Sequence, residues 1–171
     1  MKSTVMAIKD AFIGELKHES SMTKKMLEKV PLDKKAWKPH EKSMSLGRLA
    51  THVAENTHWV STIIHIDDFD FMKDYNFNPA VAASTEELLR IFQTNLDKAI
   101  ADLSTMNDDD FSKNWTVRRG EQVMSVTPKK IAIRGWGFNH MIHHRGQLSV
   151  FLRLLDVPVP GMYGPSADEK M

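Results

Sequence analysis

The chain has 171 residues, of which 42% are hydrophobic and 26% are charged. This size and composition are typical of one folded unit, so we expect a single domain over residues 1–171. The 23 basic and 22 acidic side chains leave a net charge of +1, which argues against binding to nucleic acid or to an anionic membrane. The absence of cysteine excludes disulfides, thiolate metal sites and a cysteine nucleophile.

The sequence shows no signal for export or membrane insertion. Lys9, Asp10 and Glu15 interrupt the N-terminal region, whereas a signal peptide needs an unbroken apolar segment. No stretch approaches the roughly 20 apolar residues that span a bilayer. We therefore expect a cytoplasmic protein.

Hydrophobic periodicity predicts four long helices. The first is expected from about Thr4 to Val30, because Pro31 cannot continue a hydrogen-bonded turn. A second helix should follow a cap at Ser43 or Ser45 and extend to about residue 66.

Two further helices are expected in the second half of the chain. Residues 67–83 are predicted to be a connection, after which Ser84 and Glu87 form a capping box for a helix to about residue 106. The last helix should be capped by Thr127, begin at Pro128 and extend to about residue 155.

Between these two helices, the sequence NWTVRRGEQVMSV contains two β-prone runs around Arg118–Gly120 and predicts a hairpin. The expected fold class is therefore all-α, a four-helix bundle with a small β-hairpin insertion before the last helix.

Three of the eight histidines are predicted to face the interior of the bundle. His52 shares a helical face with Trp59 and Ile63, while His58 and His65 fall on the polar side and are expected to be solvated. On the last helix, His140 and His144 lie in the middle of the apolar stripe.

The spacing of His140 and His144 allows both imidazoles to bind one metal ion, as in H-E-x-x-H proteases. The sequence here is HMIHH, so the glutamate that acts as a base in that motif is missing. His52 would complete a three-histidine site with an open position for water or substrate. The alternative is that each inward histidine is a hydrogen-bonded core residue.

Three other side chains are candidates to support such a site. Glu55 and Asn56 lie near the face of His52, and Gln147 is central on the last helix. Glu55 and Asn56 could hydrogen-bond the ligands or move protons, or they could simply border the apolar stripe. Gln147 could orient a metal-bound water, or it could simply bond to a neighbouring helix. His143 lies at the edge of the stripe and is the candidate for a fourth ligand, although its direction argues against that role. No catalytic residue is identified.

Three segments of the chain resemble the DinB/YfiT-like family of four-helix-bundle proteins, which are regarded as metalloenzymes. These are PHEKSMSLGRLATHVAENTHW, SVTPKKIAIRGWGF and FNHMIHHRGQLSVFLRLLDVPVPGMYGPSADE. Together they cover the second helix and the last third of the chain.

The resemblance implies an up-down-down-up bundle, commonly dimeric, with a divalent metal held by three histidines. The family's ligand positions fall on His52, His140 and His144, the residues that periodicity selects, and the metal is usually zinc or nickel. Better-known relatives are thiol-dependent S-transferases and a glutathione-dependent maleylpyruvate isomerase. The resemblance therefore also implies a low-molecular-weight thiol cosubstrate.

Two functions remain open from the sequence. The first is a metal-dependent enzyme that activates a water or a thiol towards a small-molecule substrate, as an S-transferase or a hydrolase. The second is a non-catalytic, metal-stabilised bundle that binds a small ligand or a partner in a stress response. A homodimer is expected, with Trp37, Trp115 or the segment Phe69–Phe71 as contact residues.

Overall fold

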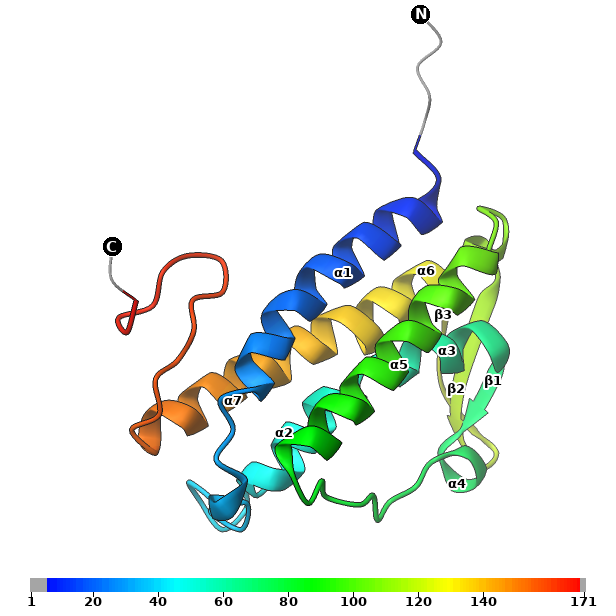
Figure 1. Ribbon diagram of the computed structural model, residues 1–171. Helices are drawn as coiled ribbons and strands as arrows, with labels where there is room; N and C mark the ends of the chain where they lie inside the picture. The colour runs from blue at the N-terminus through cyan, green and yellow to red at the C-terminus, as the bar shows by residue number, and fades with distance from the viewer. Residues whose placement is uncertain (1–5, 170–171) are drawn as a thin grey trace, which may run out of the picture.

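The computed structural model describes residues 6–169 of the chain (Figure 1). The helices are α1 (Ile8–Leu27), η1 (Leu32–Lys34), α2 (Leu46–Glu55), α3 (His58–His65), α4 (Phe71–Asp74), α5 (Thr85–Thr105), η2 (Asp110–Ser112), α6 (Lys129–Ala132), the π-helical segment η3 (Ile133–Asn139) and α7 (His140–Leu154). The strands are β1 (Asp68–Asp70), β2 (Asn114–Arg119) and β3 (Gln122–Pro128).

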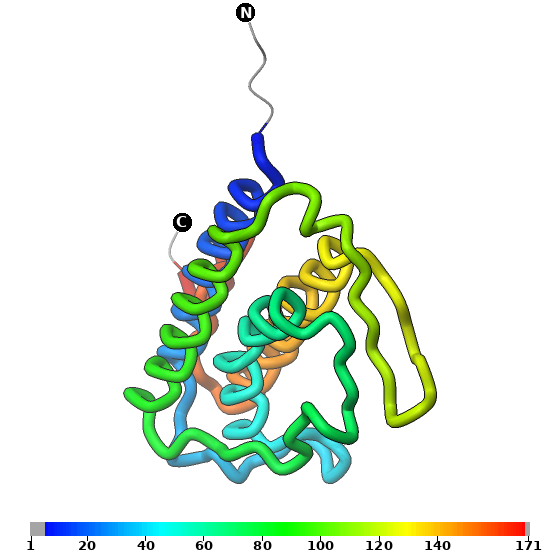
Figure 2. The backbone as a smooth tube through the Cα atoms, turned by 90° about the vertical axis from the view of Figure 1, so that its right-hand side faces the viewer, coloured from blue at the N-terminus to red at the C-terminus, as the bar shows by residue number. Residues whose placement is uncertain are grey.

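Four long helical segments form the bundle: α1, α2 with α3, α5, and the last segment from α6 to α7. Helix α5 packs against α1, α2 and α3, and α7 packs against α1 and α2 (Figures 1 and 2). Their inward faces make one apolar core, whose largest fully buried members include Phe92, Phe111, Phe138, Leu16 and Leu49. This confirms the predicted helical bundle. None of the described helices combines the length and the hydropathy that a membrane span requires.

A small sheet lies beside the bundle (Figure 2). Strands β2 and β3 form the predicted hairpin, which turns at Gly120 with a φ of 59°. Strand β1 adds to β2 in parallel, so that Asp68 pairs with Thr116 and Asp70 with Arg118. Asp70 also accepts hydrogen bonds from the backbone amides of Met72 (2.9 Å) and Gly120 (2.9 Å). The prediction that residues 67–83 are only a connection is therefore wrong, because this segment contains β1 and α4.

The second predicted helix is divided into two. Helix α2 ends at Glu55 and α3 begins at His58, so the regular periodicity stops between them. One consequence concerns His58, which is half-buried and donates from Nδ1 to the carbonyl of Glu55 (2.8 Å). Burial lowers its pKa. The expectation that His58 is solvated is wrong, whereas His65 is exposed as predicted.

The last helix differs from the prediction at its start and in its first turns. Strand β3 continues to Pro128, so α6 begins at Lys129 and Thr127 does not act as its cap. Residues 133–139 are π-helical and therefore wider than an α-helix. This wide segment packs closely on α3, because a Cβ added at Gly137 would lie 2.8 Å from Cγ2 of Val60.

Most of the aromatic side chains expected at a dimer contact are covered within the chain. Trp115 is 1% exposed and Phe69 is 2% exposed. Trp37 is half-buried and packs edge-to-face on Phe151, with 5.6 Å between the ring centroids. Trp115 and Phe69 were therefore wrong choices as contact residues. Dimerisation itself stays a prediction.

Candidate metal centre

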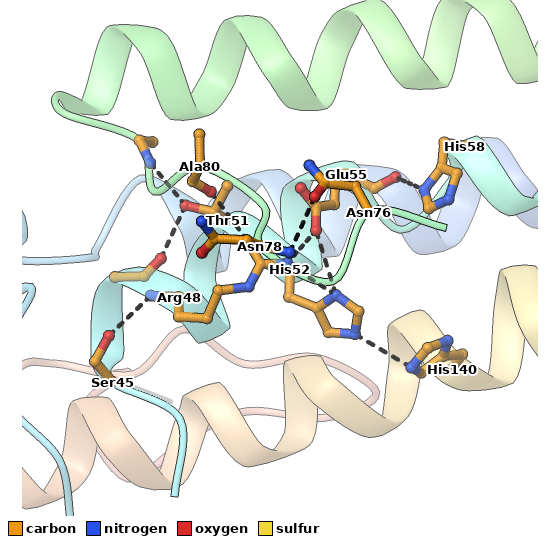
Figure 3. Close-up of polar contacts among 12 residues, drawn as sticks. Ser45, Arg48, Thr51, His52, Glu55, His58, Asn76, Asn78, Ala80 and His140 are labelled. Atoms are coloured by element: carbon orange, nitrogen blue, oxygen red, sulfur yellow. Dashed lines mark hydrogen bonds and ion pairs between the residues drawn. The ribbon is translucent and has the colours of Figure 1, made fainter. Parts of the chain in front are cut away.

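The three histidines selected from the sequence lie together between α2 and α7. His52 comes from the last turn of α2, and His140 and His144 come from the first two turns of α7. Each ring offers one nitrogen to a cluster in which the three atoms lie within 4.8 Å of one another. The Nε2 atoms of His52 and His140 are 3.3 Å apart and face each other (Figure 3). The ring centroids of His52 and His144 are separated by 4.5 Å.

The second ring nitrogen of His144 is occupied by a neighbour on the same helix. Nδ1 of His144 lies 2.7 Å from Oε1 of Gln147, which accepts its proton. The ring of His144 therefore carries its lone pair on Nε2, the nitrogen left for the cluster. His140 also presents Nε2 to the cluster, since this atom faces Nε2 of His52.

The ring of His52 is held by two charged side chains of α2. Its Nδ1 lies 3.5 Å from Oε1 of Glu55 and 3.3 Å from Nη2 of Arg48 (Figure 3). Arg48 and Glu55 also form an ion pair with each other, and Arg48 donates to the carbonyl of Ala80 (3.2 Å). A metal at Nε2 requires the proton on Nδ1, and Glu55 is then its acceptor because a guanidinium can only donate.

The electrostatics of the cluster favour the neutral form of His140 and His144. Burial, together with the neighbouring imidazoles, lowers the pKa of His140 to about 4. Burial and the nearby His52 lower the pKa of His144 to about 4, against an opposing hydrogen bond to Gln147. Burial would raise the pKa of Glu55, but its hydrogen bonds to His52 and Arg48 leave that pKa lowered. At neutral pH His140 and His144 are therefore uncharged nitrogen donors, which is the form that binds a metal.

The remaining candidates lie outside the cluster. His143 is exposed and does not belong to the group of converging ligand atoms. Asn56 is fully buried, and within residues 6–169 its side-chain amide has no hydrogen-bond partner, so it does not orient a histidine ring. Over the same residues the cluster includes no fourth histidine or carboxylate. Three ligands leave a coordination position open, as in catalytic zinc sites.

Arg48 is a further member of the site that was not predicted, although the sequence contains a signal for it. Arg48, His52 and Glu55 are spaced i, i+4 and i+7, which places all three on one face of α2. The connection between α4 and α5 passes over this face, where Thr51 Oγ1 accepts a hydrogen bond from the amide of Ala82 (3.0 Å) (Figure 3).

Two surface grooves meet the cluster along α7. One, of ≈ 500 Å³, is lined by Gly135, Trp136, Asn139, His140 and His143. The other, of ≈ 380 Å³, is lined by Lys42, Ser43, Met44, Leu49, His144, Gln147, Val150 and Phe151. Since each groove includes one of the clustered histidines, small molecules can reach them from the surface.

Comparison with known proteins identifies relatives of the whole fold. The family model described as DinB family matches residues 1–170. The uncharacterized protein YjoA of Bacillus subtilis is 25% identical over 138 residues, which cover 78% of this chain and 81% of that protein. The uncharacterized protein YrdA of the same organism is 24% identical over 160 residues, 94% of this chain and 90% of YrdA.

Solved structures agree with this relationship. A DinB-like protein from Bacillus cereus superposes with a TM-score of 0.70 at 22% identity, over 92% of this chain and 98% of that one. The crystal structure of the DinB-like protein YjoA from Bacillus subtilis superposes with a TM-score of 0.66 at 17% identity, over 94% and 99% of the two chains. The match of the family model over nearly the full length shows that this chain belongs to the DinB family.

Proposed function

We propose that this protein is a divalent-metal-dependent enzyme that acts on a small molecule, with His52, His140 and His144 as the metal ligands. The observation that carries the proposal is the convergence of three imidazole nitrogens within 4.8 Å without a fourth protein ligand in residues 6–169. The ring of His144 is also fixed by a hydrogen bond to Gln147 that leaves Nε2 free for a metal. Three neutral nitrogens suit zinc and nickel equally, and we propose one of these two ions.

The reaction follows from the donor set and the surrounding side chains. A divalent ion bound by three histidines lowers the pKa of a water or thiol ligand and so supplies a nucleophile at neutral pH. Gln147 keeps the proton of His144 on Nδ1, and Glu55 can keep that of His52 on Nδ1, so both rings stay in the tautomer that binds metal. Because the chain has no cysteine, a sulfur nucleophile must come from a low-molecular-weight thiol cosubstrate. Transfer of such a thiol or hydrolysis both fit this arrangement.

The competing function is a non-catalytic bundle that the metal only stabilises. A structural metal site is normally closed by four protein ligands, whereas a catalytic site keeps one position for water or substrate. Here the cluster has three ligands and borders two grooves, which supports catalysis. We further propose that the active form is a homodimer, which sedimentation of the metal-loaded protein would test.

The metal site is tested by replacing one histidine inside the cluster and one outside it. Purified without a nickel column and loaded with zinc or nickel, the wild-type protein should hold one ion per chain. His144→Ala should lose the ion while keeping its helical circular dichroism, and the adjacent exposed His143→Ala should keep both. Full metal content in His144→Ala, or equal losses in the two variants, would contradict the proposal.

A second measurement separates the two nucleophiles. Cobalt substitution provides a chromophore at the site, and a coordinated thiolate adds a sulfur-to-metal charge-transfer band. If a thiol is the cosubstrate, addition of glutathione or cysteine should produce this band in the wild type and in His143→Ala. A spectrum that no thiol changes would favour the hydrolase reaction.

A further inference from the structure

The groove beside His144 has the features of a substrate-binding site. We call it the Lys42 groove, and its lining is formed by the turn before α2, by Leu49 and by one face of α7. We propose that it binds the substrate of the metal centre and selects small molecules with a short apolar body and a carboxylate at the outer end. The proposal rests on the proposed function, because it takes the metal next to His144 as the reacting end.

Four of the eight residues that line the groove are apolar. Phe151 and the buried Leu49 belong to the apolar core or pack against it. Trp37 packs edge-to-face on Phe151, with 5.6 Å between the ring centroids. Met44 and Val150, which are 40% and 55% exposed, stand at the rim. Burial of these surfaces favours an apolar ligand body, and a volume of ≈ 380 Å³ is at the small end of ligand pockets.

The polar groups of the groove are chiefly hydrogen-bond donors. Lys42 is exposed and forms no ion pair within residues 6–169. Gln147 uses its amide oxygen for His144, which leaves the NH₂ group free to donate. None of the eight lining residues is acidic. A ligand that carries an acceptor or a negative charge therefore complements this surface.

The backbone holds Lys42 at the rim. Its amide donates to Nδ1 of His40 (3.2 Å), and the amide of Ser43 donates to the carbonyl of His40 (3.0 Å). The turn is tied to the bundle, since the amide of Leu46 donates to the carbonyl of Trp37 (2.8 Å). The ammonium group is thus tethered to an ordered turn that lines the groove together with α7.

A second cavity differs from the Lys42 groove in the charge of its lining. It measures ≈ 320 Å³ and is lined by Glu55, His58, Thr62, Ile66, Phe69, Asp74, Tyr75, Asn76, Pro79 and Asn95. Two carboxylates line it, and it contains none of the three clustered histidines. An anionic molecule that must reach the metal is therefore better matched by the Lys42 groove.

The test compares hexanoate with its neutral analogue hexanamide in NMR titrations of zinc-loaded and of chelator-treated protein. In both forms hexanoate should bind more tightly than hexanamide. Lys42→Gln should weaken hexanoate by about two- to fivefold, the range for an exposed ion pair, and leave hexanamide unchanged. Lys38→Gln, an exposed lysine outside the groove, is the matched control and should change neither affinity.

A second pair of variants tests the apolar body. Val150→Trp should fill the groove and weaken both probes by at least about tenfold. Leu154→Trp should weaken neither probe, since Leu154 is similarly exposed on α7 (57%) but is not a lining residue. All four replaced side chains are exposed, so the fold should be retained.

Two results would overturn the inference. The first is a hexanoate affinity that is equal in the wild type and Lys42→Gln. The second is binding that chelation abolishes, because the carboxylate would then be ligating the metal itself. Failure of the proposed function has a different signature, namely a wild-type protein that retains no zinc while its Lys42 groove still binds hexanoate.

Discussion

A buried ion pair between Glu19 of α1 and Arg145 of α7 should contribute strongly to the stability of the fold. The side chain of Arg145 is 3% exposed and that of Glu19 is 8% exposed, and their charged atoms lie 2.7 Å apart. Arg145 also donates to the backbone carbonyl of Glu19 (2.9 Å), to Thr23 Oγ1 (3.1 Å) and to the hydroxyl of Tyr163 (2.8 Å). Tyr163 in turn donates to Glu19 (2.8 Å), which fastens the C-terminal segment to the bundle.

Glu19→Leu leaves the buried guanidinium without its counter-charge, for which a cost of about 3–5 kcal/mol is expected. In a chain of this size each kcal/mol lowers the melting temperature by about 2–4 °C, so the variant should melt roughly 6–20 °C below the wild type. Glu19→Leu combined with Arg145→Met replaces the pair by apolar side chains and should recover most of this loss.

Urea and thermal unfolding should be followed by circular dichroism on metal-free protein, because a bound ion would add its own stabilisation. Tyr163→Phe is the control, and it should cost only about 1 kcal/mol because it keeps both charges. The reasoning is refuted if the double variant is as unstable as Glu19→Leu, or if Glu19→Leu costs no more than the control.

Three further outcomes are expected. Gln147→Leu should weaken zinc about 10- to 100-fold in competition with a chromophoric chelator, while Gln147→Glu, which keeps the acceptor, should not. Gly137→Ala should cost about 1–3 kcal/mol in urea unfolding because Val60 must move, whereas Gly135→Ala, with open space around it, should cost nothing. Burial would raise the pKa of Asp102, but the contacts with Lys98 (2.7 Å) and His65 (3.0 Å) lower it to about 2. Since a depressed folded-state pKa stabilises the fold above the unfolded value, that contribution should disappear as the pH falls from about 4 to about 2. Asp102→Asn should flatten the pH dependence of stability in that window.

The elements that the sequence predicts well are those set by local signals. Ser45 accepts a hydrogen bond from the amide of Arg48 (3.2 Å) at the start of α2, and Ser84 accepts one from Glu87 (3.2 Å) at the start of α5. The two histidines of α7 are four residues apart on one helix, so their convergence is also a local property. These positions could therefore be read from neighbouring residues alone.

The features that the sequence did not reveal depend on distant partners. Strand β1 pairs with β2 across about 50 residues, and a three-residue strand has too little periodicity to be recognised without its partner. The break between α2 and α3 and the wide turns of η3 both alter the angle per residue, which the helical-wheel reading assumes constant. His58 was placed on the polar side for that reason. His52 was assigned correctly to the interior, although Trp59 and Ile63, the residues with which it was compared, lie beyond the break on α3.

The π-helical segment η3 also determines how α7 is rotated about the helix axis relative to α6. The hairpin leads into α6 before η3, and the imidazoles of His140 and His144 project from the first two turns of α7 after it. A π-helical stretch accommodates one residue more than an α-helix of the same number of turns. Loss of that residue would rotate α7 relative to α6 by about 100°, the angle between successive residues of an α-helix. Within such a fold, gain or loss of a single residue can re-aim the imidazoles while every strand and helix is retained.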